Sequence, residues 1–98
     1  MNYILDNNGN PVKVSDPLEW AMWFQTADRT IAFDELPDGV RVSTVFLGLD
    51  HQLGNGPPLL FETMVFGGEL DEEQERYSTR DGAITGHAAM LARVRDTL

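Results

Sequence analysis

The chain of 98 residues contains no cysteine. This absence excludes disulfide bonds, metal sites built on thiolates and a cysteine nucleophile, and it is compatible with a reducing compartment. Basic residues are also few, because 7 lysines and arginines stand against 16 aspartates and glutamates, which gives a formal net charge of -9. A charge of this sign opposes direct binding to nucleic acid or anionic lipid and favours a partner with a basic surface.

Long apolar runs are missing as well. No segment approaches the roughly 20 apolar residues of a membrane-spanning helix. The first residues, MNYILDNNGN, lack the basic and apolar segments of a secretory signal. We therefore expect a soluble, cytoplasmic protein without a membrane partner. Its length suits one domain, residues 1–98, with a single core.

The densest apolar part of the chain lies at its centre, where a loop rich in glycine and proline divides it. Two runs rich in Val, Leu, Phe and Thr, Val40–Leu47 and Leu59–Phe66, have the composition of β-strands. Gly48–Pro58 between them carries three glycines and two prolines, which suit neither strand nor helix. We expect a long-looped hairpin at the centre of a sheet, with Leu49 and Leu53 holding the loop on the protein.

Two turn signals predict hairpins on the N-terminal side of this block. An Asn-Gly step separates Asn2–Leu5 from Pro11–Val14. The turn Pro37-Asp38-Gly39 separates Thr30–Leu36 from the first central strand. An antiparallel sheet of four to six strands accounts for all these segments.

Two helices are predicted beside the sheet. The pattern Asp-Pro-Leu-Glu that begins at Asp16 is typical of a helix start, and this helix should end near Ala27. A second helix should run from Thr79 almost to Leu98. Apolar residues recur along it at helical spacing and predict its buried stripe: Ile84, His87, Ala88, Leu91, Val94 and Leu98. The expected fold is α+β, with both helices packed on one face of the sheet.

The first of these helices has more apolar surface than one sheet face covers. Its apolar positions include Trp20 and Trp23 and extend around more of the helix than a single stripe. We therefore predict a homodimer with a contact that includes Trp20 or Trp23.

An acidic run follows the second central strand. Five of the seven residues at positions 69–75 are acidic, a density too self-repelling for a core. These residues are Glu69, Asp71, Glu72, Glu73 and Glu75. Carboxylates spaced along a surface can imitate the phosphates of nucleic acid and occupy a basic groove of another protein. We interpret the run as a candidate partner-binding surface, although a solvated rim explains the same residues.

A pocket for a small ligand such as a nucleotide signal is the alternative. Arginines would meet the phosphate, and Trp20 or Trp23 would stack on the base. The candidate residues of this pocket are Arg41, Asp50, His51, Glu62, Arg76 and Arg80.

A small hydrolase is the third possibility, with His51 as a base beside Asp50. The sequence shows no GxSxG motif, and a loop-stabilising Asp50 with a surface His51 explains the same residues, so we assign no catalytic residue. His51 and His87 do not form a short-spaced pair, so we predict no metal site. The glycine pairs are not followed by the helix and lysine of a phosphate-binding loop, so we predict no cofactor.

The central residues also carry a resemblance to a known group. The segments LGLDH, GPPLLFETMVFGG and RYST occur in this order, followed by the Gly-His pair of the last helix. This signature resembles a family of short, uncharacterised proteins encoded by bacteriophages and prophages, for which we know no activity. The resemblance implies a phage context, in which small acidic proteins often act on host proteins. Our main hypothesis is a non-enzymatic accessory protein that inhibits or modulates a host protein, such as a nucleic-acid-handling or anti-phage defence factor.

Overall fold

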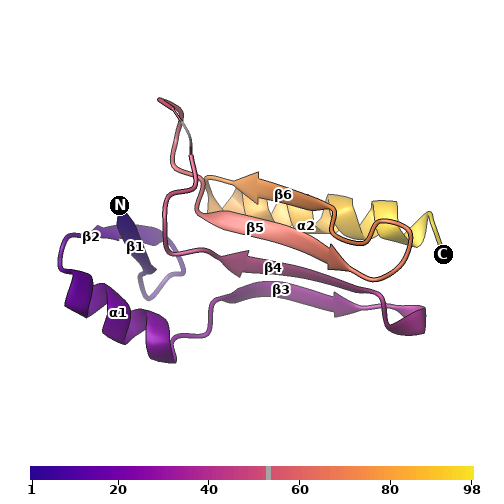
Figure 1. Ribbon diagram of the computed structural model, residues 1–98, viewed down its shortest axis with the longest axis horizontal. Coiled ribbons are helices and arrows are strands. Elements are labelled where there is room, and N and C mark those ends of the chain that lie inside the picture. The colour runs from indigo at the N-terminus through magenta and orange to yellow at the C-terminus, as the bar shows by residue number, and fades with distance from the viewer. Residues whose placement is uncertain (53) are drawn as a thin grey trace.

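Within residues 1–52 and 54–98, the computed structural model contains six strands, two α-helices and one short 3-10 helix (Figure 1). Leu53, which we expected to hold the central loop, lies outside these described residues. The elements follow the chain in the order β1 (Asn2–Leu5), β2 (Pro11–Val14), α1 (Pro17–Thr26), β3 (Thr30–Glu35), η1 (Pro37–Gly39), β4 (Arg41–Phe46), β5 (Phe61–Phe66), β6 (Gln74–Tyr77) and α2 (Arg80–Arg95). The α+β class predicted from the sequence is confirmed.

The strands form two antiparallel sheets. β1 pairs with β2, and the remaining strands form a sheet in the order β3-β4-β5-β6. Neighbours in this larger sheet are also neighbours in sequence, so it is a meander with β3 and β6 at its edges. Val42 pairs with Val65, and Thr44 pairs with Thr63. Because side chains alternate along a strand, these four share the face that α2 covers.

α2 lies along one face of the larger sheet (Figure 1). Its N-cap is Thr79, whose hydroxyl accepts a hydrogen bond from the backbone N–H of Gly82 at 3.0 Å. The buried residues of α2 are Ala83, His87, Met90 and Val94. The predicted stripe is correct for His87 and Val94 but wrong for Ile84, which is 46% exposed, because the small Ala83 packs against the sheet instead. Ala88 and Leu98 of that stripe are also exposed.

Two apolar clusters lie between α2 and the sheet. One contains Val40, Val42, Val65, Met90 and Val94. The other contains Phe46, Leu60, Phe61 and Ala83. The paired threonines of β4 and β5 fall between them in the strand register, so a polar line separates the two apolar clusters.

α1 is placed differently from α2. It packs on β1 and β2, at the end of the larger sheet (Figure 1). Its N-cap is Asp16, whose carboxylate accepts from Leu18 N at 3.0 Å. Trp23 still reaches the main core, with its ring edge-on to Phe46 at a centroid distance of 5.8 Å. The expectation that both helices pack on one face of the sheet is correct for α2. Within residues 1–52 and 54–98, the side chain by which α1 joins the core on this face is Trp23.

Candidate functional site

Two acidic turns lie side by side at one end of the larger sheet. The turn between β3 and β4 and the turn between β5 and β6 both fall at the end where α2 finishes (Figure 1). A Cβ atom at Gly68 would lie 3.0 Å from Cγ2 of Val40, so the two turns are in direct contact. This contact gathers exposed carboxylates from two separate parts of the sequence: Glu35, Asp38, Glu69, Asp71, Glu72 and Glu73.

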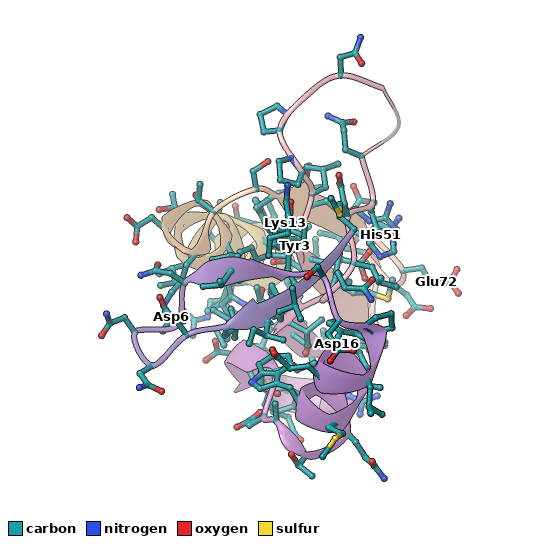
Figure 2. The ribbon with its side chains drawn as sticks, turned by 90° about the vertical axis from the view of Figure 1, so that its left-hand side faces the viewer. Tyr3, Asp6, Lys13, Asp16, His51 and Glu72 are labelled. Carbon is teal, nitrogen blue, oxygen red and sulfur yellow. The ribbon has the colours of Figure 1, made fainter. Side chains whose placement is uncertain are left out.

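The acidic residues of this end have different local roles. The Asp71 carboxylate accepts from Gly67 N at 2.6 Å and closes the β5–β6 turn. The Glu73 carboxylate accepts from Nη2 of Arg93 at 3.2 Å and ties the turn to α2. Glu69 and Glu72 are exposed, and Glu72 projects at the rim of the molecule (Figure 2). The run therefore combines carboxylates that hold the turn with carboxylates that face solvent.

Glu75, the last acid of the run, lines a groove between β6 and α2. The groove has a volume of 180 Å³, and its other lining residues are Tyr77, Gly86, Ala89, Met90 and Arg93. The Tyr77 hydroxyl is buried, and among the described residues it has no hydrogen-bond partner of normal geometry. Burial raises the pKa of Tyr77, while the nearby Thr63 hydroxyl acts in the opposite direction. The phenol at the base of the groove is therefore neutral at physiological pH.

A line of polar side chains crosses the core beneath α2. Nε2 of His87 lies 2.7 Å from the Asp34 carboxylate, and Nδ1 lies 2.7 Å from Oγ1 of Thr44. Oγ1 of Thr44 is also hydrogen-bonded to Oγ1 of Thr63 at 2.5 Å. The hydrogen-bonded line joins β3, α2, β4 and β5.

This line has the residue types of a catalytic triad, namely an acid, an imidazole and a hydroxyl, but its hydroxyl is not accessible to solvent. Thr44 and Thr63 are both 0% exposed, so solvent does not reach the hydroxyl that a substrate would have to meet. Glu62 takes no part in this line, because it lies on the opposite face of the sheet, where its carboxylate accepts a hydrogen bond from Nε of Arg76 at 3.0 Å. Sequence reasoning missed Thr44 and Thr63, although a polar residue at the centre of each inward-facing apolar row was the available signal.

The three arginines predicted for the alternative ligand pocket lie apart from one another. Arg41 stacks over the ring of Phe66 at 5.4 Å, at the acidic end of the sheet. Arg76 is paired with Glu62 at 3.0 Å, towards the other end of the same face. Arg80 begins α2 and lies against Gly9 of the β1–β2 turn. The structure does not bring these three arginines to one phosphate-sized site.

Asp50 organises the base of the central loop. Its carboxylate accepts from Gln52 N at 2.7 Å and from Leu59 N at 3.0 Å, which confirms its predicted loop-stabilising role. The hydrogen bond from Gln52, and then that from Leu59, lowers the pKa of Asp50. His51 N donates to Leu59 O at 3.1 Å across the same base.

The outer part of this loop projects beyond the sheet (Figures 1 and 2). Residues 54–57 are exposed, and Leu49, expected to hold the loop down, is 41% exposed. Leu49 instead bridges to Asn2 beside β1. The expected role of Leu49 is therefore wrong, and among the described loop residues the contacts to the rest of the protein are backbone and carboxylate hydrogen bonds at the base.

The tryptophan side chains of α1 are half-buried by contacts with other residues of the same chain. Nε1 of Trp20 donates to Tyr3 O and to Gly48 O, each at 3.1 Å, and its ring stacks on Phe24 at 4.7 Å. The surplus apolar surface of α1 belongs to Leu18 and Met22, which are 67% and 63% exposed. The homodimer predicted from this helix stays a prediction.

Neither a metal cluster nor a membrane-spanning helix is found in the described part of the chain. Residues 1–52 and 54–98 contain no group of three His, Asp or Glu side chains placed to hold a metal ion. No helix within those ranges is both long and apolar enough to cross a membrane. Comparisons with protein-family models, with curated proteins and with solved structures find no match.

Proposed function

We propose that this protein is an accessory binding protein whose acidic end docks on a basic surface of another protein. We define the acidic end as Glu35, Asp38, Glu69, Asp71, Glu72 and Glu73. The observation that supports the proposal is the contact of Val40 with Gly68, which joins two acidic turns into one surface. The phage resemblance of the central block makes a host protein the expected partner, and a protein that handles nucleic acid or defends against phage offers such a basic groove.

The local backbone suits this role because the two turns that carry the carboxylates have a defined conformation before binding. Asp38 and Glu72 have φ angles of 65° and 71°, and the Asp71 carboxylate caps its turn. A surface already fixed in its bound conformation loses less conformational entropy when a partner arrives. Opposite charges across the interface would raise the association rate and disfavour acidic competitors.

Charge reversal at positions without a structural contact tests the proposal. Glu69→Lys with Glu72→Lys should abolish capture of the partner from a bacterial lysate by the immobilised protein, with the captured proteins identified by mass spectrometry. Asp71 and Glu73 stay unchanged because they hold the turn. Glu19→Lys with Asp81→Lys is the control, since it changes the net charge equally in the first turns of α1 and α2.

The dependence of partner capture on salt concentration is a second test of acidic docking. Capture by the wild-type protein should weaken as ionic strength rises, because the screening length falls to about 8 Å at physiological salt and further above it. Equal capture by the wild type and by the Glu69 and Glu72 variant would contradict acidic docking. Calorimetric binding of nucleotides or cyclic dinucleotides that is indifferent to these reversals would support a ligand-sequestering protein instead.

A further inference from the structure

β6 is an edge strand with an exposed hydrogen-bonding side. It pairs with β5, and among the described residues no strand covers its other side. Val65 N donates to Glu73 O at 3.0 Å, so the backbone of residue 73 faces β5. In an antiparallel strand successive residues direct their backbone groups to opposite sides. The N–H and C=O groups of Gln74 and Arg76 therefore point outward, where another strand could pair with them.

The groove between β6 and α2 lies beside this edge. Its walls are the side chains of Glu75 and Tyr77 on one side and the small residues Gly86 and Ala89 with Met90 on the other. A strand added to β6 would direct alternate side chains towards α2 and hence into this groove. At 180 Å³ the groove is smaller than the roughly 300–1,000 Å³ of pockets that enclose free ligands, so it suits a single apolar side chain.

The acidic residues along β6 favour an added strand that carries basic side chains. The acids at positions 69–75 run up to and along this edge, where Arg93 is already hydrogen-bonded to Glu73 and Arg76 to Glu62. Two copies of this edge would bring Glu73 and Glu75 against like charges, which opposes pairing of the protein with itself. The other edge, β3, has an irregular register between Thr30 and Ala32, so it offers a less regular template.

We propose that β6 and the adjacent groove bind an extended basic segment of a partner protein by strand addition. The inference rests on the proposed function, because it describes how part of the basic partner is held next to the acidic end. The partner's backbone pairs with Gln74 and Arg76, one apolar side chain enters the groove, and basic side chains meet Glu73 and Glu75.

A capped heptapeptide, Thr-Lys-Thr-Val-Thr-Lys-Thr, serves as the probe, because its valine and both lysines lie on the same face of an extended strand. Its binding is followed by NMR titration of the labelled protein. Gln74→Pro removes the outward N–H without touching an acidic residue, and proline is tolerated at such an edge position. Ala89→Phe fills the groove. Each variant should weaken peptide binding by about tenfold. Gln74→Ala and Ala88→Phe, which leave the N–H and the groove intact, should bind as the wild type does.

The outcomes separate this inference from the proposed function. Strand addition is overturned if Gln74→Pro and Ala89→Phe, folded as judged by their spectra, both bind the peptide like the wild type. It is also overturned if the wild type does not bind the peptide, or if a peptide with N-methylated alternate residues binds equally well. Loss of lysate capture in the Glu69 and Glu72 reversal, together with unchanged peptide binding in the edge and groove variants, would keep acidic docking and reject strand addition. Loss of peptide binding in the edge and groove variants, together with unchanged lysate capture in the Glu69 and Glu72 reversal, would keep strand addition and reject acidic docking.

Discussion

Gly86 of α2 lies directly against the phenol ring of Tyr77 of β6. A Cβ atom at Gly86 would overlap Cε1, Cζ and the hydroxyl oxygen of that ring. A glycine inside a helix is less favourable than alanine by about 1 kcal/mol in the free energy of helix formation, so Gly86 weakens α2 at this point. The gain is close contact between α2 and the edge strand, which forms the base of the groove.

Gly86→Ala should therefore destabilise the protein although alanine favours helix. Forcing a methyl group into a packed site costs typically 1–3 kcal/mol, which exceeds the helix gain of about 1 kcal/mol over most of that range. Urea unfolding should show a lower free energy of unfolding than the wild type. Thr85→Ala, at an exposed neighbouring position, should leave stability unchanged or slightly higher. A Gly86→Ala protein as stable as the wild type would contradict the tight contact.

The buried line through His87 predicts a second stability effect. His87→Leu leaves the Thr44 hydroxyl with Thr63 as its one remaining partner and removes the link to Asp34, so it should lower the free energy of unfolding by about 1–3 kcal/mol. Adding Thr44→Val and Thr63→Val should recover part of that loss, because both buried threonine hydroxyls of the line are then removed, while the Asp34 carboxylate is 43% exposed and can be solvated. His51→Ala, at the loop base, should change stability little. Equal stability of His87→Leu and wild type would rule out this role.

Local signals in the sequence were enough to predict most elements. The Asn-Gly step, the Pro37-Asp38-Gly39 turn and the Asp16 cap each fix a conformation through adjacent residues, and the structure has the predicted hairpins and helix start there. The acidic run could also be recognised directly. The residues that lie beside the acidic run could not be predicted, because the contact between Val40 and Gly68 joins turns that are far apart along the chain.

Features that depend on relative placement were missed for the same reason. The helical spacing allowed two adjacent buried stripes on α2, and only packing against Phe46 and Phe61 selects Ala83 over Ile84. Trp20 looked like surplus surface because its indole partners, Tyr3 O and Gly48 O, come from other elements. Propensity and periodicity do not encode these long-range contacts.

We predict that Asp50 makes a pH-dependent contribution to the free energy of unfolding. Backbone hydrogen bonds lower its pKa in the folded state, so its ionised form stabilises the protein above the ordinary aspartate pKa of about 3.9. This contribution is lost as pH falls through the lowered folded-state pKa. Asp50→Ala should therefore lower the free energy of unfolding at neutral pH, and the difference from wild type should shrink in acid. A difference that is the same in urea unfolding at neutral and acidic pH would contradict this role.

The homodimer is the last prediction, and α1 supplies its expected contact. Leu18 and Met22 lie one helical turn apart and are 67% and 63% exposed, with the half-buried Trp20 and Trp23 on the same helix. Packing this face on a second copy would remove apolar surface from water. Sedimentation velocity should show a dimer that Leu18→Lys with Met22→Lys converts to monomer, whereas Phe33→Lys, on the open sheet face, should not. A wild-type monomer at high micromolar concentration would refute the dimer.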